Sequence, residues 1–111
     1  MIRVCAVGEI PEGEAVRVEH GPDGVPVAVF HVRGEYYAID DTCTHQDASL
    51  TDGYVEADDC AVECPLHAAC FSLRTGEPSG PPARVPVRTH AVVIENGHVY
   101  VQLQPAAVPV G

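Results

Sequence analysis

Closely spaced turn signals constrain the fold of this chain more than any other feature. They are GPDG at 21–24, RGE at 33–35, DG at 52–53, DD at 58–59, TG at 75–76 and NG at 96–97. Ten proline and ten glycine residues interrupt any long helical pattern. The chain can therefore form only short elements between its turns, and its 111 residues suit a single compact domain.

The segments between the turns are short and rich in apolar and β-branched residues. They are VPVAVFHV (25–32), YYAI (36–39), CAVEC (60–64), AVVIE (91–95) and HVYVQL (98–103). This pattern predicts an all-β protein built from antiparallel hairpins. The Asn-Gly pair makes 91–103 the clearest hairpin, and 27–40 is a second one. Residues 27–32 are apolar on both faces, which predicts an interior strand.

Two short motifs carry metal-ligand chemistry. Cys43-x-His45 follows one predicted strand and Cys64-x-x-His67 follows another, with eighteen residues between the motifs. Two loops that leave a rigid sheet can face each other across one site. Thiolates and imidazoles together favour zinc or an iron–sulfur cluster. Zinc modules usually group both cysteines in one knuckle and both histidines in another. Here each motif supplies one of each, which suits a two-iron cluster with both thiolates on one iron and both imidazoles on the other.

The sequences around these motifs resemble the Rieske [2Fe-2S] proteins. CTHQDASLTDG and CPLHAACFSLRTGEP are similar to the two cluster-binding loops of that family, and SGPPAR (79–84) is similar to its proline-bearing third loop. The likeness is greatest to the small ferredoxins of bacterial aromatic-ring dioxygenase systems, and it extends over nearly the whole chain. The resemblance implies one [2Fe-2S] cluster bound by four ligands. They are Cys43, His45, Cys64 and His67.

The resemblance also implies an architecture and its boundaries. The family fold is all-β, with three stacked antiparallel sheets and the cluster held by two loops at one tip. Residues 1–104 would form this Rieske domain, and residues 105–111 would form a short C-terminal tail.

Several positions depart from other Rieske proteins. Ala68 follows the second histidine where the family usually has glycine, so we expect modest backbone strain there. Ala48 and Leu66 occupy positions that form a disulfide in the high-potential respiratory members. Ala69 replaces a serine that donates a hydrogen bond to a cluster sulfur in those proteins. Because the cluster would lack that donor and would lie among carboxylates, we expect its reduction potential at the low end of the Rieske range, roughly −150 mV.

The resemblance implies an electron carrier and not an enzyme, because protein ligands fill every iron position. The chain would accept single electrons from a flavoprotein reductase and pass them to a terminal oxygenase. Both partners would dock transiently near His45, Gln46, Leu66 and His67. Two alternatives stay open at this point. One is a small subunit of a larger reductase, such as an assimilatory nitrite reductase, and the other is a zinc-stabilised interaction module.

Charge narrows the choice of partners and of compartment. The net charge is −10, every base is an arginine, and no base falls between Arg33 and Arg74, where nine carboxylates do. Such a surface disfavours nucleic acid and anionic membranes and favours a basic protein partner.

No apolar run approaches a membrane span, and the N-terminus does not resemble a signal peptide. Five cysteines, an odd number, speak against a disulfide framework, so we expect a cytoplasmic protein.

The remaining cysteines and histidines have no ligand spacing. Cys5, Cys60 and Cys70 are predicted to be small buried residues. The histidines predicted to be surface or packing residues are His20, His31, His90 and His98.

Overall fold

The computed structural model describes residues 2–19, 26–42, 49–65, 70–79 and 86–102. Within these ranges the protein is all-β, as predicted, and every strand pairing is antiparallel. A short 3-10 helix, η2 (Leu50–Asp52), precedes β5. The strands are β1 (Ile2–Ala6), β2 (Ala15–Val18), β3 (Val27–Val32), β4 (Glu35–Asp40), β5 (Tyr54–Glu56), β6 (Ala61–Glu63), β7 (Cys70–Ser72), β8 (Thr89–Glu95) and β9 (His98–Gln102).

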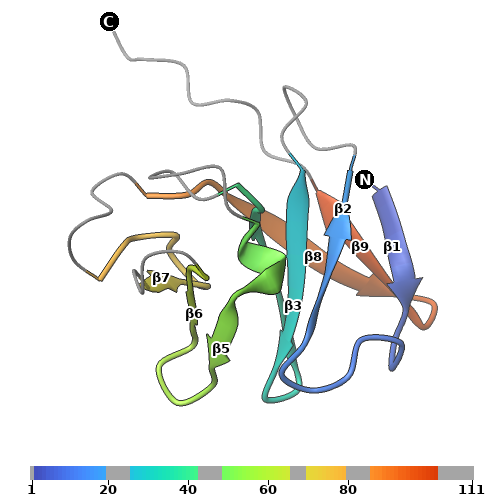
Figure 1. Ribbon diagram of the computed structural model, residues 1–111. Coiled ribbons are helices and arrows are strands. Elements are labelled where there is room, and N and C mark those ends of the chain that lie inside the picture. Colours follow the sequence, from blue (N-terminus) through green and yellow to red (C-terminus); the bar gives the residue numbers. More distant parts are fainter. Residues whose placement is uncertain (1, 20–25, 43–48, 66–69, 80–85, 103–111) are drawn as a thin grey trace, which may run out of the picture.

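The described strands form two sheets. The larger has the order β1-β9-β8-β4-β3-β2, and the smaller has the order β5-β6-β7. The larger sheet has two halves, because β4 and β8 pair only at Ala38–His90 and Ile39–Thr89. The three predicted sheets thus correspond to β1-β9-β8, β4-β3-β2 and β5-β6-β7, with the first two joined along one edge. Figure 1 shows the small sheet at one side of the molecule, away from β1.

Both predicted hairpins are present, and their turns share a backbone geometry. Arg33-Gly34 connects β3 to β4 with φ values of 50° and 78°, and Asn96-Gly97 connects β8 to β9 with φ values of 51° and 75°. Two consecutive positive φ values are the pattern of a type I′ turn, which Asn-Gly suits and arginine does not. Glu12 supports the first turn, because its carboxylate accepts hydrogen bonds from the N–H groups of Arg33 (2.6 Å) and Gly34 (3.1 Å).

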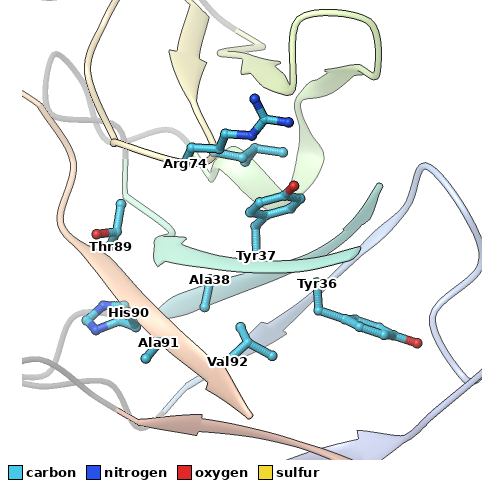
Figure 2. Close-up of a pocket in the computed structure, with 9 residues that line it drawn as sticks. Tyr36, Tyr37, Ala38, Arg74, Thr89, His90, Ala91 and Val92 are labelled. Carbon is cyan, nitrogen blue, oxygen red and sulfur yellow. The ribbon is translucent and has the colours of Figure 1, made fainter. Parts of the chain in front are cut away.

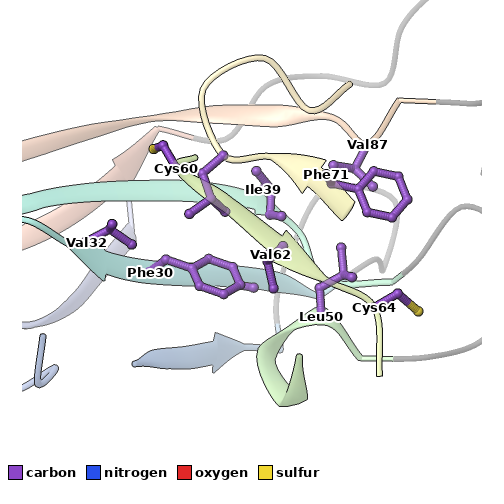
Figure 3. Packing of buried hydrophobic residues seen from close by; sticks show 11 residues of the cluster. Phe30, Val32, Ile39, Leu50, Cys60, Val62, Cys64, Phe71 and Val87 are labelled. Carbon is purple, nitrogen blue, oxygen red and sulfur yellow. The ribbon is translucent and has the colours of Figure 1, made fainter. Parts of the chain in front are cut away.

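Strand β3 separates two buried clusters. The sheet cluster consists of Ile10, Val27, Val29, Ala38, Val99 and Val101. The loop-side cluster consists of Ala28, Phe30, Val32, Ile39, Leu50, Cys60, Val62, Cys64, Phe71, Leu73 and Val87 (Figure 3). Alternate β3 side chains enter each cluster, as the two-residue period of a strand requires. This confirms that residues 27–32 form an interior strand with two apolar faces.

The sequence pattern did not indicate four of the strands. β1 and β2 are the two edges of the larger sheet, and β5 and β7 are the two edges of the smaller one. The structure also corrects the predicted strand at 60–64. Cys60 lies in a turn with a φ of 50°, and Cys64 follows the last residue of β6.

Candidate metal centre

The first motif lies between two paired ends of the chain. Thr42, which follows β4 closely, forms an antiparallel bridge with Ser49. Leu50 is fully buried, and its N–H donates a hydrogen bond of 2.7 Å to the backbone carbonyl of Asp41. Cys43, His45 and Gln46 lie outside the described residues. The residues on the two sides of segment 43–48 are thus held next to each other.

A buried carboxylate ties the two ends of this segment together. Asp41 is 1% exposed. Its carboxylate accepts hydrogen bonds from the Ser49 hydroxyl at 2.7 and 2.9 Å and from the Thr51 N–H at 2.8 Å. The Thr51 hydroxyl donates to the same carboxylate. Arg17 on β2 places its Nε 3.6 Å from Asp41 Oδ2. Hydrogen-bond donors therefore surround the carboxylate, as a buried polar group requires.

The second motif begins at the end of β6. Glu63 on β6 pairs with Cys70 on β7, so these two strands hold both ends of the segment that contains the motif. Cys64 is 1% exposed and belongs to the loop-side cluster, which also contains Leu50 (Figure 3). Leu66 and His67 lie outside the described residues. Of the four predicted ligands, the structure therefore places Cys64, and it places the chain on both sides of the other three.

Backbone contacts fix the residues on both sides of the segment that resembles a third loop. The Ser79 N–H donates a hydrogen bond of 2.8 Å to the Cys70 carbonyl, and Phe71 bridges Pro78. On the far side of this segment, the Val87 N–H donates to the Gly76 carbonyl at 2.8 Å. Residues close in sequence to segments 43–48, 66–69 and 80–85 thus belong to the loop-side cluster, namely Leu50, Cys64, Phe71 and Val87.

Basic residues reach two carboxylates of the acidic stretch. Arg88 Nε lies 3.1 Å from Asp40, and His90 Nε2 lies 2.8 Å from the same carboxylate. Arg17 lies close to Asp41, as described above. The sequence has no arginine or lysine between Arg33 and Arg74. The fold nevertheless places basic side chains from β2 and from the start of β8 beside the two carboxylates that precede the first motif. The negative charge there is thus partly balanced, which sequence order alone could not show.

The other cysteines differ in burial. Cys60 is buried as predicted, whereas Cys5 and Cys70 are only half-buried, which corrects the prediction for those two. Burial, followed by the charges of Glu56 and Glu63, raises the pKa of Cys70. Burial and then Glu9 raise the pKa of Cys5. A raised pKa leaves less thiolate, the form that binds metal, so neither residue is a strong ligand on its own.

The described histidines have structural partners. His31 stacks on Tyr36 with ring centroids 4.5 Å apart, and its Nδ1 lies 2.8 Å from the Ile10 carbonyl. His90 is buried against Asp40, and His98 Nδ1 lies 3.0 Å from the Asn96 carbonyl. These three therefore have the packing and surface roles predicted for them, while His20 lies outside the described residues.

A hollow of about 610 Å³ lies elsewhere, where β4 and β8 diverge. In Figure 2, Arg74 lies over the ring of Tyr37, while Tyr36 points to the opposite side of β4. No cysteine is among the described residues that line the hollow, and its one histidine, His90, is bonded to Asp40. The hollow is therefore not a candidate for the metal centre.

A family model for the Rieske [2Fe-2S] domain matches residues 1–91 of the chain. The chain belongs to the Rieske [2Fe-2S] family. This Rieske chain is 47% identical to the 3-phenylpropionate/cinnamic acid dioxygenase ferredoxin subunit of Escherichia coli strain K12. The match extends over 105 residues and covers 95% of each chain.

Solved structures also have folds similar to that of this chain. One is a chain in the complex of reduced oxygenase and oxidized ferredoxin in carbazole 1,9a-dioxygenase. Its TM-score is 0.82 at 38% identity, covering 91% of this chain and 100% of that one. A putative NADH-dependent nitrite reductase small subunit from Mycobacterium tuberculosis has a TM-score of 0.77 at 24% identity, covering 89% and 90%, and so shares the fold.

These likenesses confirm the predicted cofactor and kind of protein. The chain is a Rieske-type ferredoxin for one [2Fe-2S] cluster, and its relatives are ferredoxin subunits, that is, electron-transfer components and not the catalytic ones. The described residues fit such a cluster, because Cys64 of the second motif is buried in the same apolar cluster as Leu50, which follows the first motif. When bound, the cluster takes up and gives back one electron. Within the described ranges, no helix has the length and apolar character needed to cross a membrane.

Proposed function

We propose that this Rieske ferredoxin carries single electrons from a flavoprotein reductase to the terminal oxygenase of an aromatic-ring dioxygenase system. The observation that carries the proposal is structural. Cys64, from the second motif, and Leu50, which follows the first motif, are both buried in the loop-side cluster. Described residues next to both motifs are thus fixed in one apolar cluster. The names of the 47% identical relative and of the solved oxygenase–ferredoxin complex support the same function.

The proposal assigns the cluster ligands residue by residue. The thiolates of Cys43 and Cys64 bind one iron, and the imidazoles of His45 and His67 bind the other. The paired ends of both motifs support this assignment, because each pairing holds together the two ends of one ligand segment. The proposed domain extends over residues 1–104, and its tail at 105–111 lies outside the described residues.

The proposed docking face surrounds the two histidines. It comprises His45, Gln46, Leu66 and His67, all outside the described residues. Its support is that Leu50 and Cys64, which lie near the ends of segments 43–48 and 66–69, belong to one buried cluster. We propose that one face serves the reductase and the oxygenase in turn. A net charge of −10 favours basic partners in the cytoplasm, where we propose that the ferredoxin works.

Cluster assembly tests the ligand assignment. The purified wild-type protein should be coloured, and after reduction it should show the electron paramagnetic resonance spectrum of a histidine-ligated [2Fe-2S] cluster. His45→Ala and His67→Ala should each lose that spectrum, because a ligand is missing. His31→Ala is the matched control and should keep it, since His31 stacks on Tyr36 away from the motifs. A colourless wild-type protein that binds zinc, or a His45→Ala variant with an unchanged spectrum, would overturn the assignment.

Electron transfer tests the function itself. Stopped-flow absorbance should show fast reduction of the ferredoxin by a dioxygenase-type flavoprotein reductase and fast reoxidation by an aromatic-ring oxygenase. If a basic partner docks by charge attraction, the rate of electron transfer should fall as the salt concentration rises. The reason is that the Debye screening length shortens to about 8 Å at physiological ionic strength. A stable complex with a large reductase in cell extract would instead favour a nitrite-reductase type of subunit.

A further inference from the structure

We propose that Asp41 is the positioning residue of the first ligand segment and that its buried negative charge lowers the reduction potential of the centre. This rests on the proposed function, because it takes Cys43 and His45 as ligands.

The positioning role follows from the hydrogen bonds. Asp41 precedes the segment 43–48, and Ser49 and Thr51 follow it. One carboxylate receives the Ser49 hydroxyl, the Thr51 N–H and the Thr51 hydroxyl. The backbone adds the Leu50 N–H on the Asp41 carbonyl at 2.7 Å. The same residue therefore binds the chain on the far side of the ligand segment through both its side chain and its backbone.

Asp41 is itself fixed to the sheet. Its N–H donates a hydrogen bond of 2.7 Å to the carbonyl of Pro26, next to β3. Its side chain is 2% exposed, so water contributes little to holding it in place. Groups that orient metal ligands from behind commonly change metal affinity by about 10- to 100-fold when they are mutated. Asp41 has the rigidity and the contacts for that role.

The electrostatic role follows from burial and from sequence distance. Cys43 is two residues from Asp41, so their Cα atoms are at most about 7.6 Å apart. Among the described residues, the side-chain contacts of Asp41 come from donors, and an ionised carboxylate accepts hydrogen bonds on both oxygens. A fixed negative charge opposes the arrival of an electron nearby. Arg17 balances it only in part, because the Arg17 side chain is 45% exposed and therefore screened by water.

Three variants separate the two roles. Asp41→Asn keeps the shape and one acceptor oxygen but removes the charge. Thr51→Val keeps the shape of Thr51 and the charge of Asp41 but removes one donor hydroxyl. Asp41→Ala removes both the charge and the contacts. Asp52→Asn is the matched control. It also removes one carboxylate charge, but from an exposed residue of η2, the short helix that contains Thr51.

The measurements are the reduction potential of each holoprotein, by protein-film voltammetry, and the rate at which a chelator bleaches its visible absorbance. Asp41→Asn should shift the potential to a more positive value, by more than Asp52→Asn does. Thr51→Val should lose its cluster roughly tenfold faster than wild type, with a much smaller shift in potential. Asp41→Ala should show both effects. If Asp41→Ala does not fold, Asp41→Asn and Thr51→Val still test the two roles.

Equal potentials for Asp41→Asn and Asp52→Asn would overturn the electrostatic role. Wild-type rates of cluster loss in both Thr51→Val and Asp41→Asn would overturn the positioning role. A wild-type protein without any [2Fe-2S] spectrum would instead refute the proposed function, so the two failures can be told apart.

Discussion

Leu50 and Cys64 are packed into the same buried cluster, with exposures of 0% and 1%. Leu50 follows the first motif, and Cys64 opens the second. A single patch of apolar packing therefore fixes the base of one ligand segment and the first ligand of the other. Any change in that patch should affect the centre as well as the fold.

We predict that Leu50→Ala lowers the free energy of unfolding by about 2–5 kcal/mol, because it leaves a cavity in the loop-side cluster. It should also speed the loss of the cluster under native conditions. Ile10→Ala is the matched control, since Ile10 is 1% exposed and lies in the sheet cluster. It should cost similar stability, measured by urea denaturation, and leave the rate of cluster loss close to wild type. Equal rates for the two variants would contradict the link.

The two hairpin turns give a second prediction. Arg33 and Asn96 have φ values of 50° and 51°, but asparagine tolerates that region far better than arginine does. Arg33→Asn should therefore raise the free energy of unfolding by about 1 kcal/mol. The exposed ion pair of Arg33 with Asp58 offsets little of this gain. Asn96→Ala should lower stability by a similar amount. The urea midpoint should move while its slope stays constant, and an unstable Arg33→Asn protein would contradict the argument.

A third prediction concerns Gly76. Its φ is 78°, and a Cβ there would collide with the backbone carbonyl oxygen of Val87. Gly97 has a similar φ of 75° but open space around it. Gly97→Ala should therefore cost about 1 kcal/mol, from backbone strain alone. Gly76→Ala should cost clearly more, because the backbone must also move. Thermal denaturation of both variants checks this, and equal losses would mean that the chain at Val87 yields easily.

The fourth prediction is a dependence of stability on pH. The N–H groups of Arg33 and then Gly34 lower the pKa of Glu12 from its ordinary value of 4.5, with smaller contributions from the charges of His31 and Arg33. A lowered pKa means that the folded state prefers the ionised form. The stabilisation is therefore complete above the ordinary pKa and is lost as the pH falls through the folded-state value.

Glu12→Gln should be less stable than wild type near neutral pH, and the difference should shrink on acidification below about pH 4. Urea denaturation at a series of pH values measures this. Glu14→Gln removes a nearby exposed carboxylate and should show no such convergence. A gap between wild type and Glu12→Gln that stays constant into acid would show that the lost contact is not electrostatic.

Local sequence patterns predict part of the fold. The Asn-Gly hairpin, the interior strand at 27–32 and the position of both motifs just after strands can be read from neighbouring residues alone. Edge strands such as β1 and β2 carry weaker alternation, because only part of their surface is buried.

The surroundings of the centre could not be predicted, because they depend on contacts that are distant in sequence. Arg17 and Asp41 are 24 residues apart, and Asp40 and Arg88 are 48 residues apart. The half-burial of Cys5 and Cys70 likewise depends on which strands neighbour them. Three of the four proposed ligands lie outside the described residues, and the assignment of all four stays a prediction from the motifs.

The two-faced burial of β3 has a consequence for chains that have not yet received iron. Residues of the β5-β6-β7 sheet pack with Ala28, Phe30 and Ile39 in the loop-side cluster. The proposed ligands add a metal-based cross-link that helps to hold the small sheet in place. When the small sheet opens in a newly made chain, this apolar face meets water and can associate with other chains. The fraction of chains that aggregates during synthesis should therefore fall as the supply of iron and sulfide rises.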